Sequence, residues 1–161
     1  MIAVETDVSA DWDSRIDWPG LARSAVHAAV ACSRHAGLCD NEVSVKFTSD
    51  EELRQLNAAW RGQDKATNVL SFPMAEESEL ASAQLLGDVV LAYGVCAGEA
   101  GDKHVAIEVH AAHLVVHGTL HLLGYDHETS EGDAEEMEET ERQALASLGI
   151  ADPYQVSEVQ S

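Results

Sequence analysis

Aromatic residues and long apolar runs are both scarce in this chain of 161 residues. Phe, Trp and Tyr make up 5% of the chain, whereas hydrophobic residues make up 45%, so Val, Leu and Ala must fill most of a globular core. No apolar run approaches the roughly 18 residues that a membrane-spanning helix needs. The acidic amino terminus lacks the basic and apolar segments of a signal peptide. We therefore expect a cytoplasmic protein with a single domain over residues 1–161, of which about 152–161 form a tail.

Cysteine is also scarce, and its spacing argues against a disulfide framework. Cys32, Cys39 and Cys96 are an odd number and include no C-x-x-C pair. The stretch containing Cys32, His35 and Cys39 could hold a metal on paper, but such residues on an amphipathic helix usually pack in the core. We expect free thiols.

Positive charge is the third shortage. The chain has 9 basic and 29 acidic residues, a net charge of −20, and residues 128–141 (ETSEGDAEEMEETE) contain eight acids and no base. Lys and Arg supply most non-specific affinity for nucleic acids, so a nucleic-acid substrate would need a local basic patch or a partner that brings it. We interpret the acidic run as a solvated helix face. Alternatively, it repels unwanted nucleic acids or contacts a basic protein.

Hydrophobic periodicity and turn residues predict an α+β fold, in which helices pack on a small mixed β-sheet. Strands are expected at 2–6, 43–48, 69–73 and 87–93. Helices are expected at Leu21–His35, from a capping box at Ser49 and Glu52 to about Ala59, at His104–Leu123, and from a capping pattern at Ser130 and Asp133 to before Gly149. Residues 76–84 are expected to form a loop.

Histidine is concentrated in HLVVHGTLHLLGYDH, residues 113–127, which holds four of the eight in the chain. His117 and His121 are four residues apart, so on a helix they share one face, about 6 Å apart. Two imidazoles so placed can share one Zn²⁺. Gly124 permits the turn that would bring His127 to the third side of the metal. Three protein ligands leave a position open for water, as in catalytic zinc sites, and we predict one zinc ion per chain.

His113 lies one helical turn before His117 and offers an alternative ligand set with His117 and His121. Its span of eight residues is about 12 Å along the helix axis, which is too long for one ion. We therefore expect His113 to line the cleft or to support a ligand from behind, and His110 to be packed or on the surface.

The spacing H-x-x-x-H-x-x-G-x-x-H occurs in a group of zinc metalloproteases, but one of their residues is missing. These proteases carry a glutamate general base after the first histidine, and this chain has Gly118 there. The nearest carboxylate in sequence is Asp126, which could orient an imidazole or act on the metal-bound water. A peptidase is therefore disfavoured. A reaction that mainly needs a Lewis acid and charge stabilisation, such as phosphodiester cleavage, is favoured.

Three segments resemble one known family. HGTLHLLGYDH resembles the signature of the YbeY family, bacterial metal-dependent endoribonucleases implicated in ribosomal RNA maturation. WRGQDKATNVLSFPM is similar to the family's R-x-x-D-x-x-T-D-V-L-S-F segment, and LGDVVLAY to its L-G-D-I-x-I strand. The resemblance spans about residues 40–148. One departure is Asn68, where the family usually has aspartate, and another is the density of acids in residues 128–141.

The resemblance implies which residues form the site. His117, His121 and His127 correspond by position to the zinc ligands, and Arg61 to the family's functional arginine. A guanidinium near the metal would hold a phosphate through two hydrogen bonds and stabilise charge on it. Lys65 could extend the same basic patch, because these two are the only bases between Arg54 and Lys103.

The resulting hypothesis is a zinc-dependent, single-strand-specific endoribonuclease in ribosomal RNA processing, with Arg61 and His117 in catalytic roles. The resemblance further implies maturation of the 3′ end of 16S ribosomal RNA and ribosome quality control. It implies as partners ribosomal RNA and the small ribosomal subunit, with a ribosomal protein and an Era-type GTPase as further candidates. No membrane and no DNA specificity are expected. The alternatives are a zinc hydrolase of another substrate and a zinc-containing ribosome-assembly factor with little catalysis.

Overall fold

The computed structural model describes residues 1–126 and 131–151. In these residues one sheet has the strand order β1-β2-β4-β3. β1 and β2 are parallel, β2 and β4 are parallel, and β3 is antiparallel to β4, so the sheet is mixed, as predicted. The strands are β1 (Ala3–Val8), β2 (Glu42–Thr48), β3 (Val69–Pro73) and β4 (Leu85–Ala92).

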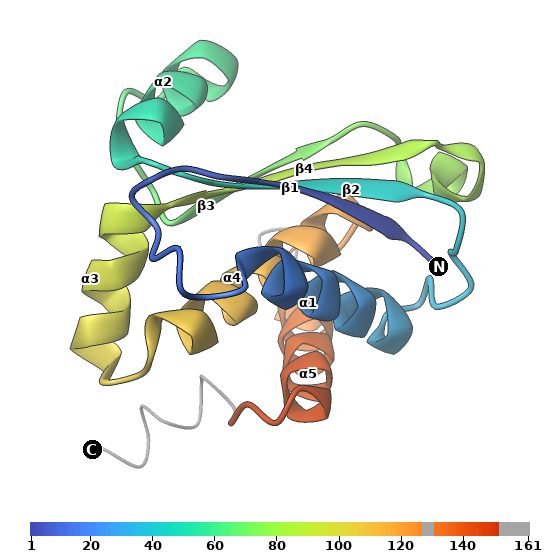
Figure 1. Cartoon of the computed structure of the whole chain (residues 1–161). Coiled ribbons are helices and arrows are strands. Elements are labelled where there is room, and N and C mark those ends of the chain that lie inside the picture. The colour runs from blue at the N-terminus through green and yellow to red at the C-terminus, as the bar shows by residue number, and fades with distance from the viewer. Residues whose placement is uncertain (127–130, 152–161) are drawn as a thin grey trace.

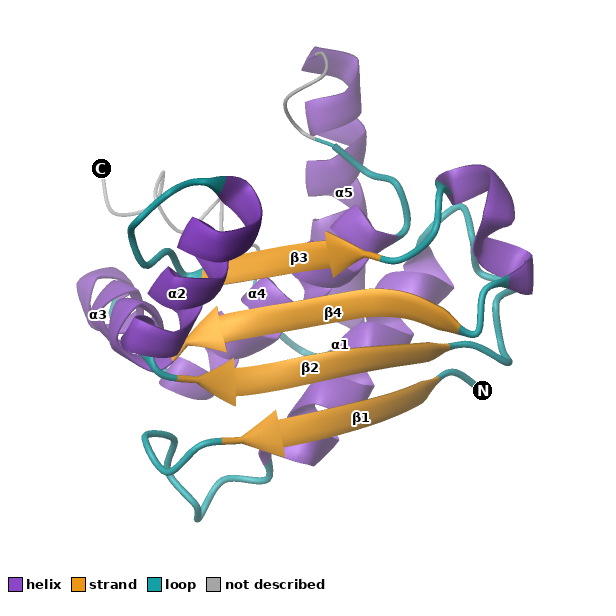
Figure 2. Cartoon of the chain, turned by 90° about the horizontal axis from the view of Figure 1, so that it is seen from above, coloured by secondary structure: helices purple, strands orange, loops and turns teal. Residues whose placement is uncertain are grey.

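Helices cover the two faces of the sheet unequally. α1, α4 and α5 lie below the sheet in Figure 1, whereas α2 lies on the opposite face, nearest the viewer in Figure 2. α4 packs against β3 and β4 and also contacts α1, α3 and α5, so it is the central helix. The α+β prediction is confirmed. The helices are α1 (Trp18–Cys32), α2 (Asp50–Arg61), α3 (Tyr93–Lys103), α4 (Ile107–Leu122) and α5 (Glu131–Ser147), with a 3₁₀ helix η1 (Glu77–Ser82).

Four of the eight aromatic residues are gathered in one part of the core. The ring of Trp12 makes edge-to-face contacts with Trp18, Phe47 and Tyr93, at centroid distances of 4.9, 5.0 and 5.3 Å. Such pairs prefer this edge-to-face geometry. Small aliphatic residues line the contact between α1 and the rest of the core, among them Ala22, Ala25 and Ala29. The expectation that Val, Leu and Ala do most of the packing therefore fits the structure.

The start of the predicted central helix needs correction, and a helix that was not predicted precedes it. The predicted helix over His104–Leu123 is preceded by a separate helix, α3, and His104 is the left-handed residue that ends α3, with φ of 57°. The carboxylate of Asp50 accepts a hydrogen bond from the backbone N–H of Val95 at the start of α3, a long-range contact that local sequence does not reveal. α4 begins only at Ile107.

The remaining differences are smaller. α1 begins at Trp18, with Asp17 as its N-cap, and ends at Cys32 rather than at His35. Residues 77–82 form a 3₁₀ helix instead of a loop, with backbone hydrogen bonds from Glu79 to Glu76 and from Ala83 to Leu80. The predicted cap at Ser130 and the predicted tail lie outside the described residues.

The predicted capping box is only half formed. Ser49 accepts the backbone N–H of Glu52, as predicted, at 3.1 Å. The Glu52 carboxylate instead accepts the hydroxyl of Thr48 at 2.5 Å and pairs with Lys46.

No helix in the described part of the chain is both long enough and apolar enough to cross a membrane.

Candidate metal centre and cleft

His117 and His121 lie one turn apart near the end of α4, as the sequence predicts. Their Nε2 atoms are 3.1 Å apart, and the two rings stand nearly perpendicular to each other. α4 is buried around most of its circumference, and these two histidines are among its half-buried residues. The helix thus presents two imidazole nitrogens side by side at one point.

The opposite nitrogen of each ring is engaged by a group that can only accept a hydrogen bond. Nδ1 of His117 donates to Oε1 of Glu141 at 2.6 Å, and Nδ1 of His121 donates to the carbonyl oxygen of Tyr125 at 3.0 Å. Both Nδ1 atoms therefore carry a hydrogen, and both Nε2 atoms of the neutral rings carry a lone pair. Two lone pairs at 3.1 Å repel each other, so the pair is suited to a cation that both can bind at about 2.0–2.1 Å.

Glu141 belongs to α5, and its side chain is only 1% exposed. Its second oxygen, Oε2, accepts a hydrogen bond from Nε2 of His113 at 3.0 Å. Burial alone would raise the pKa of the Glu141 carboxyl, but the hydrogen bonds from His113 and His117 outweigh it and lower that pKa to about 2. The carboxylate is thus held in its charged form between two histidines.

Glu141 lies in the acidic run 128–141, which we interpreted as a solvated helix face, and for this residue that interpretation is wrong. The acidic residues described between 131 and 139 are mostly exposed, but Glu141 lies four residues after Met137 and four before Leu145, which are both buried. This helical spacing was the signal that could have found it. Its position on the apolar face of α5 points the carboxylate at α4.

His113 and His110, on the same helix, have different partners. His113 supports His117 indirectly through Glu141, one of the two roles that the sequence left open for it. His110 is packed, with 3% of its surface exposed, and Nε2 lies 2.8 Å from Oε1 of Glu99. Burial lowers the pKa of His110, although the bond to Glu99 opposes the shift.

Contact with Glu99 explains why this chain has Asn68 at a position where the family usually has aspartate. Its side-chain amide donates to Oε1 of Glu99 at 3.0 Å, and its Oδ1 accepts the backbone N–H of Val69 at 2.7 Å. An aspartate at this position would face the Glu99 carboxylate with a like charge. Asparagine is therefore the residue that suits this partner, and its amide also lines the cleft described next.

An open cleft of about 820 Å³ lies beside the two histidines. α2 and the loop after it supply Arg61 and Lys65, β3 supplies its wall, and the turn after α4 supplies Asp126. Arg61 is the last residue of α2, which ends at Gly62 in the left-handed conformation. The cleft therefore brings together five of the predicted site residues: Arg61, Lys65, His117, His121 and Asp126.

Arg61 and Lys65 are available to an anionic ligand. Both are exposed, and within the described part of the chain neither side chain forms an ion pair or a hydrogen bond. Arg54 on the same helix differs, because its guanidinium pairs with the carboxylates of Glu51 and Asp64. The cleft thus has two positive charges that form no ion pair with the described residues, in a protein of net charge −20.

The third predicted ligand, His127, lies outside the described residues. Among residues 1–126 and 131–151, no group of three or more His, Cys, Asp or Glu side chains is arranged to hold a metal ion. The donors that are described do fit zinc, because they are two imidazoles whose Nε2 atoms lie 3.1 Å apart and whose Nδ1 atoms are each held by a hydrogen-bond acceptor.

Gly118 faces the sheet, not the cleft. A Cβ atom at this position would lie 2.7 Å from Cγ1 of Val89 and 3.0 Å from Oγ of Ser71. The Ser71 hydroxyl also donates to the carbonyl oxygen of Gly118 at 3.0 Å. The close approach of α4 to β3 and β4 thus leaves no room for the glutamate that a zinc protease carries at this position.

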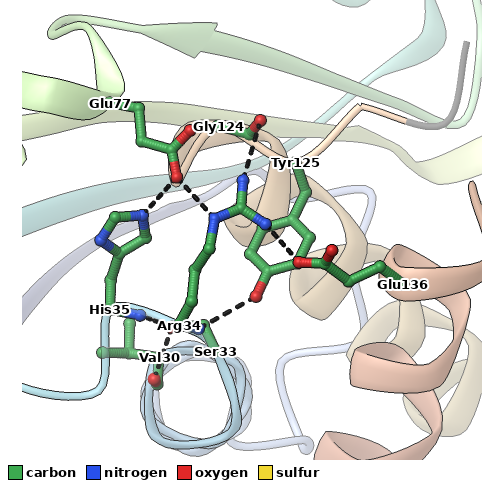
Figure 3. A network of polar contacts seen from close by, with 8 residues as sticks. All are labelled: Val30, Ser33, Arg34, His35, Glu77, Gly124, Tyr125 and Glu136. Atoms are coloured by element: carbon green, nitrogen blue, oxygen red, sulfur yellow. Dashed lines mark hydrogen bonds and ion pairs between the residues drawn. The ribbon is translucent and has the colours of Figure 1, made fainter. Parts of the chain in front are cut away.

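Arg34, in the turn just after α1, holds the turn that follows α4 (Figure 3). Its guanidinium lies 4.0 Å from the ring centre of Tyr125, and its backbone N–H donates to the Tyr125 hydroxyl at 3.0 Å. The same guanidinium pairs with Glu77 at 2.6 Å and with Glu136 of α5 at 2.5 Å. Because the Tyr125 carbonyl holds His121, this network fixes a support of the metal centre.

Comparison with known proteins agrees with the resemblance seen in the sequence. The family model described as Endoribonuclease YbeY matches residues 9–149. An Endoribonuclease YbeY of Novosphingobium aromaticivorans is 48% identical, with 96% of this chain and 97% of the relative covered. Another, from Rhizorhabdus wittichii, is 47% identical, with 98% and 99% covered.

A solved structure shares the fold. The solution structure of TM1509 from Thermotoga maritima matches with a TM-score of 0.59 and 24% identity, over 92% of this chain and 91% of that one. The family model and the two close relatives match nearly the whole chain, well beyond the histidine motif. The chain therefore belongs to the endoribonuclease YbeY family.

Proposed function

We propose that this endoribonuclease is zinc-dependent, cuts single-stranded RNA and acts in ribosomal RNA processing. The observation that carries the proposal is the pair of Nε2 atoms, 3.1 Å apart, with the Nδ1 atom of each ring held by an acceptor, beside a cleft with Arg61 and Lys65. A cation-binding pair next to uncompensated positive charge suits a phosphodiester substrate. Maturation of the 3′ end of 16S ribosomal RNA and ribosome quality control are the roles that the family resemblance suggests.

In this proposal His117, His121 and His127 hold one zinc ion. Zinc supplies a Lewis acid that stabilises negative charge on a phosphate. Glu141 and the Tyr125 carbonyl keep the two helix-borne imidazoles in the required orientation. Arg61 holds the phosphate through its planar guanidinium, and Lys65 adds charge along the strand. Asp126, exposed at the same cleft, is placed to orient a group or to accept a proton.

The strong negative charge bears on the partners. With two free cations in the cleft, affinity for free RNA should be low, so delivery of the substrate by a ribosomal particle is favoured. We propose the small ribosomal subunit in the cytoplasm as this setting, with a ribosomal protein and an Era-type GTPase as candidate partners. No specificity for DNA is expected.

A peptidase is the weaker alternative, because Gly118 leaves no room for the protease base. An assembly factor with little catalysis is a more serious rival, and the net charge of −20 favours it. In that case zinc would be structural, and Arg61→Ala would leave function intact.

The test compares the wild type with His121→Ala, Arg61→Ala and Arg54→Ala. Bound zinc is determined for each purified protein, and each is incubated with a single-stranded fragment of ribosomal RNA. We expect about one zinc per chain except in His121→Ala, which should lose both zinc and cleavage. Arg61→Ala should keep zinc but cut about 10- to 100-fold more slowly, since a hydrogen bond to a charged phosphate contributes roughly 1.5–3 kcal/mol.

Arg54→Ala is the matched control, because Arg54 lies on the same helix but is neutralised by Glu51 and Asp64 outside the cleft. It should cut like the wild type. Equal RNA decay with all four proteins would point to a contaminating nuclease and favour the assembly factor.

A further inference from the structure

We propose that Glu141 is the positioning residue of the metal centre. It holds the imidazole of His117 with Nε2 turned toward the cation, and it is itself held by His113. The inference rests on the proposed zinc site, and it assigns a role in that site to a residue of a different helix.

Burial makes Glu141 exceptional. It is the only Asp or Glu among the described residues that is buried. Removing a carboxylate from water is costly unless hydrogen bonds compensate it, so a chain with no use for the charge would carry an apolar residue here. The neighbours of Glu141 on the same face of α5, Met137 and Leu145, are apolar. A single buried carboxylate within an apolar stripe is therefore a candidate functional group.

The contacts of the carboxylate restrict the His117 ring. Oε1 accepts from His117 and Oε2 accepts from His113, two histidines on successive turns of α4. With both oxygens engaged, the carboxylate cannot rotate freely, and the His117 ring cannot turn over without breaking a 2.6 Å hydrogen bond. A carboxylate behind a ligating imidazole fixes the protonated nitrogen and makes the other a better ligand.

The two helix-borne ligands differ in what supports them. His121 is held by the backbone carbonyl of Tyr125, which no substitution removes directly. His117 depends on a side chain from α5. A substitution at position 141 therefore acts on one ligand and leaves the support of the other in place.

Glutamine is the informative replacement because it keeps the shape and removes one acceptor. The amide offers one oxygen, whereas His113 and His117 together need two acceptors. One imidazole must then lose its partner or move its proton to the other nitrogen. For His117 this would place a hydrogen on the atom that should bind zinc, and loss of such a support typically weakens metal binding about 10- to 100-fold.

The experiment measures zinc affinity by competition with a chelator for the wild type, Glu141→Gln and Glu135→Gln. Glu135 is exposed on the same helix, so its substitution makes the same change in charge away from the site. We expect binding weakened about 10- to 100-fold in Glu141→Gln and unchanged in Glu135→Gln. Equal affinity of Glu141→Gln and wild type would overturn the inference. A wild type that binds no zinc would instead overturn the proposed function.

A spectroscopic measurement on the full-length wild type after a chelator has removed zinc needs no variant, because no metal bond then decides which nitrogen of His117 carries the hydrogen, and it stays decisive if Glu141→Gln folds poorly. Long-range ¹H–¹⁵N correlation spectra of the histidine rings identify which nitrogen of each ring carries the hydrogen. We expect it on Nδ1 in His117 and on Nε2 in His113, as their bonds to Glu141 require. A hydrogen on Nε2 of His117 would overturn the inference. A purely structural role for Glu141 would not fix this nitrogen.

Discussion

Gly118 shows how one residue separates this metal centre from that of a zinc protease. The sequence shows that a glutamate is missing there, and this correctly argues against a protease. It could not show why, because the reason lies in residues 29 and 47 positions earlier in the chain. Val89 and Ser71 bring the sheet so close to α4 that a side chain larger than hydrogen has no space.

The same contact predicts the effect of adding a methyl group. Gly118→Ala should lower the free energy of unfolding by about 1–3 kcal/mol, since overpacking a tight core forces neighbours to shift. Chemical denaturation followed by circular dichroism measures it. Gly98→Ala is the control, because Gly98 lies within α3 with no atom near its Cβ position, and it should stabilise by roughly 0.5–1 kcal/mol. A neutral Gly118→Ala would mean that α4 is not held this close to the sheet.

At the scale of elements, local patterns predicted the strands well but not the division between α3 and α4. The strands alternate or are continuously apolar, and both patterns are local. The segment of α3, YGVCAGEAGDK, has three glycines and therefore low helix propensity. It is held as a helix by packing on α4 and by Asp50 at its amino end. Such long-range contacts cannot be read from a window of sequence.

In the candidate site, too, some residues could be predicted from local sequence and others could not. His117 and His121 were predictable because four-residue spacing on one helix fixes their relation. Glu141 joins them from α5, 24 residues further along the chain from His117, and the surrounding acids hid it. His127 stays a prediction.

The turn after α4 is an element whose support can be tested through Arg34. Arg34→Met keeps an apolar stem over Tyr125 but removes the ion pairs with Glu77 and Glu136. The side chain is 40% exposed, so solvent screening limits the loss of stability to about 0.5–1 kcal/mol. The sharper expected effect is local. The backbone amides of Gly124 and Tyr125 should exchange faster with deuterium, and zinc binding should weaken.

Arg15→Met is the matched control, because Arg15 pairs only with Asp13 in an exposed loop. It should leave exchange at the turn unchanged. Unchanged exchange in Arg34→Met as well would show that the hydrogen bonds that end α4 hold the turn without help from Arg34.

At the scale of the whole molecule, charge should govern how RNA binds. A protein of net charge −20 with two free cations in its cleft can neutralise only about two phosphates. For a single strand, each neutralised phosphate contributes about −0.7 to the slope of log affinity against log salt concentration. We therefore expect a slope of about −1.4 for a non-cleavable single-stranded oligonucleotide, measured by fluorescence anisotropy.

Arg61→Ala should reduce the magnitude of that slope by about 0.7, whereas Arg54→Ala should leave it unchanged. A slope several times steeper in the wild type would mean that RNA contacts a basic surface other than this cleft. It would also argue against delivery of the substrate by a partner.

The contribution of α5 to the proposed metal centre also determines at which stage of protein synthesis the site can form. A ribosome makes α4 before α5, so a growing chain exposes His117 and His121 before it contains Glu141. On our proposal, the early chain has two imidazoles whose rings are not yet fixed, and it should capture zinc weakly. Full binding would come only when α5 emerges and packs against α4. An unfinished copy of this nuclease would therefore be inactive beside the ribosome that is making it.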